Sequence, residues 1–303
     1  MIFLYHGIVP EGSPSARWRA GQAIPRDDFE RHVAFLARRR RLLPLDEYLR
    51  LRPDDPRATR TATLTFDDGL RSSFDNAVPV LRRHGAPATF FVTTAHVESR
   101  EPLWFSYLNA LAFESIDDSV EAGGGNWPLR SLSERLRARR ALGERARASG
   151  DPVGWARTLA QRYPLPPEVA ARYEGIRPEE LRSVAASELF EIGSHTLTHP
   201  FLTQLTPEAQ AVEVTESRRR LAELCGRPVR FFAYPAGDYD ARTLAAVRGA
   251  GYSAGLATIP KRLESNGHFE IERIGIYSPS SLKLRLKAMG AAGLARRLGL
   301  GVG

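Results

Sequence analysis

Short runs of apolar and β-branched residues recur along the chain and alternate with longer amphipathic stretches. Each run has the length, and the content of Val, Ile, Phe, Tyr and Thr, of a buried strand. The expected strands span residues 2–5, 62–66, 88–94, 190–193, 230–234 and 252–257. Strands that alternate with helices are typical of a parallel α/β sheet or barrel.

The stretches between these strands carry apolar residues at helical spacing, which predicts amphipathic helices. Two such sets are Phe29, Val33 and Leu36, and Phe74, Val78 and Leu81. A further helix is expected to begin at Pro207, because Thr206 can cap its first turn and Glu208 suits its N-terminal dipole.

Residues 97–187 break the alternation and are expected to form a mostly helical insertion in a domain of residues 1–280. The insertion contains three glycines at 123–125 and a run rich in Arg and Ala at 135–148. Long inserts in compact domains often act as lids or binding elements, so we expect this one to shape substrate choice.

Residues 281–303 carry leucines among Lys and Arg, which predicts a basic amphipathic C-terminal helix. Such a helix can lie on an anionic membrane or pack on its own domain. The sequence leaves both arrangements open.

Length and composition favour one folded domain. The chain has 303 residues, of which 43% are hydrophobic and 26% charged, and this excludes widespread disorder. Lys and Arg outnumber Asp and Glu by 43 to 35, which gives a net charge of +8. This charge favours anionic partners, such as a nucleotide- or lipid-linked sugar, an acidic glycan or a membrane surface, although solvated helix faces also explain it. We expect no nucleic-acid partner.

Signals for targeting and redox chemistry are few. Cys225 is the only cysteine, which excludes an intramolecular disulfide, and its spacing from Leu221 and Leu224 predicts a buried structural thiol. The first residues are typical of a strand rather than a signal peptide, and no stretch approaches the roughly 20 apolar residues of a membrane span. We therefore expect a cytoplasmic protein.

The strand expected at residues 62–66 ends in two adjacent carboxylates and a glycine. Neighbouring side chains of a strand point to opposite faces, so joint use of Asp67 and Asp68 requires the chain to turn there. Gly69 permits this turn. Because Asp-Asp-Gly is also an ordinary turn sequence, it does not establish a site by itself.

Two histidines follow another expected strand. His195 and His199 are four residues apart, so on one helical turn both rings could reach one ion. Two His and one carboxylate commonly hold a catalytic divalent metal. Since the carboxyl ends of parallel strands meet on one face, we expect the carboxylate pair Asp67-Asp68 to join the two histidines in a metal site.

These two elements resemble motifs of a known family. Residues 65–69 and 194–199 are similar to the first two motifs of the polysaccharide deacetylase family, the NodB-homology group that resembles carbohydrate esterase family 4. The order and separation of the motifs are also similar, and the resemblance extends from His6 to about Ile276. It implies a distorted (β/α)7-type, NodB-like barrel with a helical insertion.

The resemblance also implies roles for the motif residues. Asp67 would be the general base, and Asp68, His195 and His199 would ligate a divalent metal. Zn²⁺ is the first expectation, with Co²⁺, Ni²⁺ or Mn²⁺ as alternatives, because ligand identity does not fix the metal.

A third element at residues 231–240 resembles the third motif of the family but departs from it. Many members carry an Arg that orients the base where Ala233 stands here, and Arg273 is our candidate replacement. The backbone N–H of Tyr234 would be the oxyanion donor by resemblance. Pro235 would contact the substrate.

A second departure concerns the general acid. Many members carry it as a His in a Leu-x-His motif near the C-terminus, which this chain lacks. The pair Tyr5-His6 resembles a pair in the branch that includes deacetylases of poly-N-acetylglucosamine. This likeness implies that His6 is the acid or a substrate contact and that Tyr5 contacts the substrate.

The predicted activity is metal-dependent hydrolysis of an N-acetyl group on an amino sugar, a glycan or a glycan precursor. O-deacetylation or N-deformylation would use the same site. A non-haem iron oxygenase also uses two His and one carboxylate, but it has no need of a second Asp beside the ligand. A non-catalytic glycan-binding protein is the remaining alternative, and the presence of Asp67 beside the three expected ligands argues against it.

Overall fold

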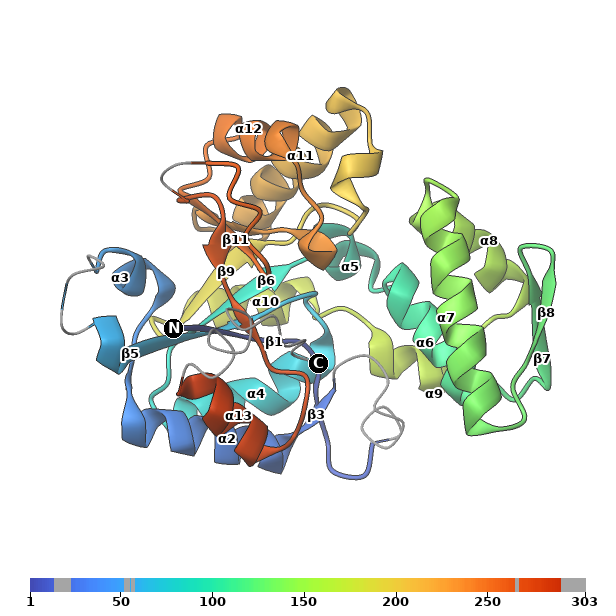
Figure 1. Cartoon of the computed structure of the whole chain (residues 1–303), viewed down its shortest axis with the longest axis horizontal. Helices are drawn as coiled ribbons and strands as arrows, with labels where there is room; N and C mark the ends of the chain where they lie inside the picture. The colour runs from blue at the N-terminus through green and yellow to red at the C-terminus, as the bar shows by residue number, and fades with distance from the viewer. Residues whose placement is uncertain (14–22, 52–54, 56–57, 265–266, 290–303) are drawn as a thin grey trace.

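The computed structural model describes residues 1–13, 23–51, 55, 58–264 and 267–289 (Figure 1). At its centre, parallel strands form a sheet that curls into a nearly closed barrel with helices around it, as the sequence predicts. The strands follow the order β12-β11-β10-β9-β6-β5-β1-β13, with β4 beside β5. Their bounds are β1 (Ile2–Tyr5), β4 (Arg41–Leu42), β5 (Thr61–Phe66), β6 (Ala88–Val92), β9 (Phe190–Ser194), β10 (Phe231–Ala233), β11 (Ala254–Ala257), β12 (Ile271–Glu272) and β13 (Ile274–Gly275).

One short segment closes the barrel. β12 pairs with β11, and β13 pairs with β1, so consecutive residues bind both ends of the sheet. Arg273 lies between them, and its N–H donates to Ala257 O at 2.8 Å. The N–H of Ile276 donates to Leu4 O, also at 2.8 Å. The backbone on each side of Arg273 is therefore fixed to a barrel strand.

The strands are buried on both faces, as expected for a parallel sheet covered by helices. Side chains alternate between an inner cluster and an outer one. In β1, Ile2 belongs to the inner cluster, whereas Phe3 and Tyr5 pack outward with the helices. This alternation decides which residues of each strand can face the barrel end.

The surrounding helices confirm the sequence pattern. α2 (Arg26–Arg39) and α4 (Arg71–Arg83) bury the apolar sets expected for them, and Thr206 caps α11 (Pro207–Cys225) by accepting a hydrogen bond from Ala209 N. Cys225 at the end of α11 is buried and free, as predicted. The other helices on the barrel are α3 (Leu45–Leu49), α5 (Thr94–Ser99), α10 (Pro178–Ala185), α12 (Ala241–Gly249) and α13 (Ser281–Ala288). The two-residue strands β2 (Ile8–Val9) and β3 (Ile24–Pro25) form a separate pair.

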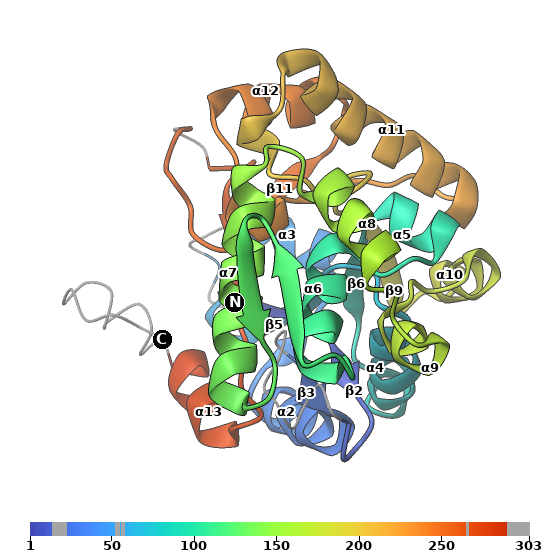
Figure 2. The ribbon, with the colours of Figure 1, turned by 90° about the vertical axis from the view of Figure 1, so that its right-hand side faces the viewer.

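Elements between β6 and β9 form a lobe beside the barrel, at the right of Figure 1 and facing the viewer in Figure 2. Its buried apolar residues make a cluster of their own, apart from the barrel core. The antiparallel hairpin β7–β8 is a feature that the sequence did not predict. The lobe consists of α6 (Trp104–Glu114), β7 (Ser119–Ala122), β8 (Gly125–Pro128), α7 (Leu132–Ala148), α8 (Pro152–Arg162) and α9 (Pro167–Ala170).

The C-terminal helix α13 packs on α2 through the buried side chains of Leu284 and Ala288. Leu282, Leu286 and Met289 are exposed. The rest of the predicted helix, 290–303, lies outside the described residues. Among the helices that the structure describes, none is long and apolar enough to cross a membrane.

The turn from β5 to α4 depends on Gly69, and we predict that Gly69→Ala destabilises the protein by about 2–4 kcal/mol. Gly69 has a φ of +85°, and a Cβ there would lie 2.8 Å from Val92 Cγ1. The control is Gly85→Ala, which shares a positive φ of +55° but meets nothing within 4 Å, and it should cost only about 1 kcal/mol. Urea unfolding measures the free energy of unfolding of both variants. Equal losses in the two would show that Val92 moves aside without a loss of stability.

Candidate metal and catalytic site

The carboxyl ends of the strands open into a cavity of about 630 Å³, a volume typical of small-molecule sites. Residues that directly follow the barrel strands line one side, and residues from α6 and α7 of the lobe line the other. The barrel side carries His6, Asp67, Asp68, His195, His199 and Arg273. The lobe side carries Trp104, Phe105, Asn109, Phe113, Leu136 and Arg139.

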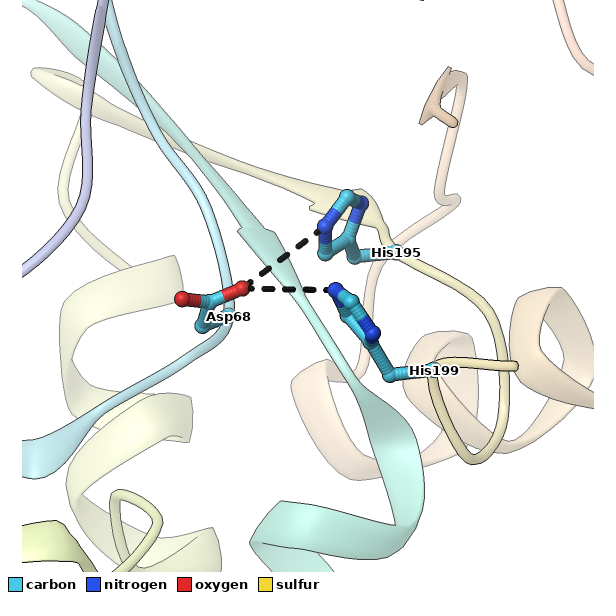
Figure 3. Close-up of side chains that lie close together, drawn as sticks. All are labelled: Asp68, His195 and His199. Carbon is cyan, nitrogen blue, oxygen red and sulfur yellow. Dashed lines mark ion pairs between the residues drawn. The ribbon is translucent and has the colours of Figure 1, made fainter. Parts of the chain in front are cut away.

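Asp68, His195 and His199 converge at the floor of this cavity (Figure 3). The Nε2 atoms of His195 and His199 each lie 3.7 Å from Asp68 Oδ1. Two ligands held about 2.1 Å from one Zn²⁺ at the tetrahedral angle are about 3.4 Å apart, so this spacing fits a metal ion. All three side chains are buried, where an unpaired donor set of this kind is costly.

The two imidazoles meet through a loop, so the expectation that they share a helical turn is wrong. Residues 195–199 are not helical, and Thr196 and His199 have φ values of +69° and +62°. Asp68 also has a positive φ, at +79°. Left-handed backbone is rare for residues other than glycine and collects at functional sites, where the surroundings must hold it in place.

Glu213 on α11 holds the histidine loop. Its carboxylate accepts hydrogen bonds from Leu197 N and Thr198 N, both at 2.9 Å, and from Thr198 Oγ1 at 2.6 Å. The hydroxyl of Thr196 accepts another from His199 N at 3.0 Å. Glu213 is nearly buried, so these bonds stabilise the strained loop more than exposed ones would.

Burial keeps the histidines of the cluster neutral. It lowers the pKa of His195 and lowers the pKa of His199 well below its usual value. Ala233 O lies 2.8 Å from Nδ1 of His195 and accepts the hydrogen that this nitrogen carries in the neutral ring. Nε2 then carries the lone pair that faces Asp68, which is the tautomer a metal requires.

Asp67 is paired with Arg273 from the closing segment. Two parallel hydrogen bonds join them, from Nη1 to Oδ1 at 2.6 Å and from Nη2 to Oδ2 at 2.8 Å. Burial alone would raise the pKa of Asp67, but the guanidinium opposes it and the pKa falls to about 2. Burial and the charge of Asp67 both raise the pKa of Asp68. Asp67 is therefore a fixed, ionised carboxylate beside the cluster.

His6 lines the same cavity, and its Nδ1 is buried without a hydrogen-bond partner among the described residues. Burial lowers its pKa to about 4, with Arg273 and His195 adding to the effect and Asp67 opposing it. The ring centroid of Tyr277 lies 5.8 Å from that of His6. His6 is thus a neutral ring that lines the cavity.

Three other expected contacts differ in the structure. The Tyr5 ring is fully buried between Phe29 and Phe66, because alternation along β1 turns it outward, so it does not reach the cavity. The N–H of Tyr234 donates to Leu256 O at 3.2 Å and is not free for an oxyanion. Pro235 is buried, and the next residues, Ala236 and Gly237, line the cavity instead.

Several cavity residues had no signal in the sequence. Tyr277 and the lobe residues reach the site through the fold, and their local sequence has no motif. Trp104 donates from Nε1 to His199 O at 2.9 Å, which ties the lobe to the histidine loop. Glu213, which holds the histidine loop, also had no signal in the sequence. It lies on α11 three positions before Glu216, and only its burial in the structure distinguishes it from that glutamate.

The profile of the polysaccharide deacetylase family matches residues 54–255. The chain belongs to this family. The match includes Asp67 and the three residues of the cluster, whereas His6 and Arg273 lie outside it. Family membership supports an enzyme that acts in carbohydrate deacetylation.

Two proteins with similar sequences are deacetylases by name. YxkH of Bacillus subtilis, provisionally named a polysaccharide deacetylase, is 21% identical over 278 residues, which cover 91% of this chain and 70% of YxkH. The poly-β-1,6-N-acetyl-D-glucosamine N-deacetylase of Staphylococcus epidermidis is 29% identical over 117 residues, 38% of this chain and 39% of that protein.

Solved structures share the fold at low identity. The Streptococcus pyogenes deacetylase PplD in complex with acetate gives a TM-score of 0.58 at 21% identity, over 95% of this chain and 96% of PplD. IcaB from Ammonifex degensii gives 0.58 at 18% identity, over 96% of each chain. Both structures therefore share the overall fold of this chain over nearly its whole length.

We predict that Arg273→Gln destabilises the protein by about 3–5 kcal/mol at pH 7, because Asp67 stays buried without its cation. In the wild type the pair stabilises the fold above about pH 4, and this contribution is lost as the pH falls toward the Asp67 pKa of about 2. In the variant, burial raises the pKa of Asp67, so the variant recovers stability in acid. Urea unfolding should show that the difference in free energy of unfolding between wild type and Arg273→Gln becomes smaller from pH 7 to pH 3.

The control for Arg273 is Arg230→Gln at the other end of the barrel, which removes a partly exposed guanidinium that pairs with Glu191 at 2.7 Å and with Asp46 at 3.1 Å. Arg230→Gln should lower the free energy of unfolding by less than about 1 kcal/mol. A difference between Arg273→Gln and wild type that does not change with pH would contradict the account of Asp67.

We predict that Glu213→Gln loosens the histidine loop, because a neutral amide cannot accept three hydrogen bonds as a carboxylate does. Amide hydrogen exchange of residues 196–199 should become about 10- to 100-fold faster. Glu216→Gln, on the exposed side of the same helix with Arg219 as partner, is the control and should leave the exchange unchanged. Unchanged exchange in Glu213→Gln would mean that the loop is held by other contacts.

Proposed function

We propose that the protein is a metal-dependent hydrolase that removes N-acetyl groups from an amino sugar within a glycan or a glycan precursor. The observation that carries this proposal is the convergence of Asp68, His195 and His199 beside a separate carboxylate, Asp67, in the cavity of a polysaccharide deacetylase family member. Two histidines and one carboxylate leave a position open for water on a catalytic ion.

We assign the metal ligands as Asp68 Oδ1 and the Nε2 atoms of His195 and His199, with Zn²⁺ as the first choice and Co²⁺, Ni²⁺ or Mn²⁺ as alternatives. When bound, such an ion polarises the acetyl carbonyl and lowers the pKa of its water. The fixed tautomer of His195 and the strained loop at His199 keep both nitrogens aimed at one point.

Asp67 is the general base in this proposal. Arg273 holds both of its oxygens, so the carboxylate cannot swing toward the ligand position, and it lies 3.8 Å from His195 Nε2. Because its pKa is about 2, it is ionised throughout the neutral range and can accept a proton from the attacking water. Arg273 acts through Asp67 as a positioning residue.

His6 contacts the substrate and is the candidate acid for the departing amine: it takes up the proton that Asp67 removes from the attacking water and donates it to the amine nitrogen as the C–N bond breaks. Its lowered pKa of about 4 makes the resting ring neutral, so it offers an N–H or a lone pair to a substrate hydroxyl. The aromatic side chains of Trp104, Phe105 and Tyr277 line the same cavity and can stack on the apolar face of a sugar ring.

The substrate and its setting extend this proposal. The excess of Arg suits an N-acetylated sugar linked to a nucleotide or lipid phosphate. The exposed Leu282 and Leu286 lie on α13 with Lys283, and the exposed Met289 directly follows the helix, which suits contact with an anionic membrane surface near such a lipid.

The test is acetate release from UDP-linked, lipid-linked and oligomeric N-acetylglucosamine by protein with and without added metal. We expect release to require the metal, and Asp67→Asn to lower kcat by about 10²- to 10⁴-fold while metal content is retained. His199→Gln should lose the metal itself, as measured by elemental analysis. The control is Asp75→Asn, an exposed residue on α4.

Undiminished acetate release by metal-stripped protein or by Asp67→Asn would overturn these assignments. Release from oligomers alone would remove the idea of a linked precursor and leave the hydrolase intact.

A further inference from the structure

The lobe side of the cavity carries a guanidinium that the proposed chemistry does not use. Of the charged side chains that line the cavity, Asp67, Asp68 and Arg273 belong to the centre at its floor. Arg139 is the fourth, and it comes from α7 on the opposite wall. A cation facing substrate space across from the reacting groups can set which substrate is accepted.

Arg139 is held in place by the neighbouring helix. Its Nε donates to Asn109 Oδ1 on α6 at 2.7 Å, and Asn109 is itself buried, with 4% of its surface exposed. Within the described part of the chain, Nη1 and Nη2 have no hydrogen bond or ion pair with protein. The hydrogen bond from Nε therefore orients the side chain, and Nη1 and Nη2 remain available to bind an anion with two parallel hydrogen bonds.

Other arginines of α7 make hydrogen bonds and ion pairs within the lobe. Arg135 donates to Ala112 O at 3.0 Å, at the end of α6, and Arg140 pairs with Glu144 at 2.8 Å on the solvent side. Arg139 differs from both in facing the cavity without a carboxylate. Burial is the cause that lowers its pKa, with no acidic group to raise it, yet a guanidinium stays charged at any physiological pH.

We propose that Arg139 is an anion subsite, and that the sugar substrate carries a phosphate or carboxylate group that this guanidinium binds while the N-acetyl group lies at Asp68, His195 and His199. This inference rests on the proposed function and narrows it to anionic N-acetylated sugars. The oxyanion would supply the partner that a partly buried cation lacks. Neutral homopolymers would lack this contact.

The experiment compares three monosaccharides that differ in charge: N-acetyl-D-glucosamine, its 1-phosphate, and N-acetylmuramic acid, which carries a carboxylate. Wild-type kcat/KM should favour an anionic sugar over the neutral one by about 10- to 100-fold, the worth of a charge-assisted pair. In Arg139→Gln this ratio should fall to about one, and in Arg139→Lys it should be intermediate. Arg140→Gln, one position along α7, should keep the wild-type ratio.

A binding arm makes the result independent of turnover. Calorimetry with the metal-loaded Asp67→Asn protein should give the same preference for the anionic sugar, and adding Arg139→Gln should abolish it. The phosphate and carboxylate arms distinguish a phosphoryl-linked precursor from an acidic glycan.

The outcomes separate the two proposals. Acetate release from neutral and charged sugars at one rate, unaltered by Arg139→Gln, would overturn the subsite and leave the hydrolase standing. Absence of acetate from every sugar, together with anion binding that depends on Arg139, would support the subsite and contradict the hydrolase. Binding that ignores both the charge and Arg139 would overturn the subsite outright.

Discussion

The buried ion pair between Arg273 and Asp67 links the closure of the barrel to the arrangement of its site. Arg273 occupies the junction where one segment pairs with β11 on one side and β1 on the other, so its backbone is fixed only when the barrel is complete. Its guanidinium then holds the carboxylate that follows β5. A buried pair of this kind contributes orientation more than net stability, since its attraction mainly offsets desolvation. The ionised Asp67 in turn raises the pKa of Asp68.

Backbone strain surrounds this pair. Asp68, Thr196 and His199 all adopt left-handed conformations, each at a cost of order 1–3 kcal/mol for residues other than glycine. The contacts that hold them come from separate parts of the chain: Glu213 from α11, and Trp104 from the start of the lobe. Because the loop is held from several sides, both imidazoles stay directed at one position although the backbone between them is not helical. The site therefore depends on tertiary structure around it as much as on its own residues.

The sequence predicted what local pattern determines and missed what distant contacts determine. Strand positions and the buried faces of α2 and α4 followed from periodicity, and the gathering of the aspartates and histidines at one end of the sheet followed from strand order. The choice of Asp68 as the partner of His195 and His199 came from the family resemblance. The loop between the histidines could not be foreseen, because positive φ values there have no glycine to mark them. Tyr5 turned outward because alternation in β1, rather than its place beside His6, fixes its direction. The lobe residues reach the cavity only through helix packing, which leaves no trace in a motif.

The separate core of the lobe has a consequence for how such enzymes diversify. Because α6, α7 and α8 bury their apolar residues against one another, substitutions on the cavity-facing side of α6 and α7 need not disturb the barrel core. The ends of the strands and the lobe thus face each other across one cavity, but each is supported by its own hydrophobic core. Under the roles proposed above, substitutions on the lobe would change substrate choice during evolution while the reacting groups at the strand ends stay unaltered.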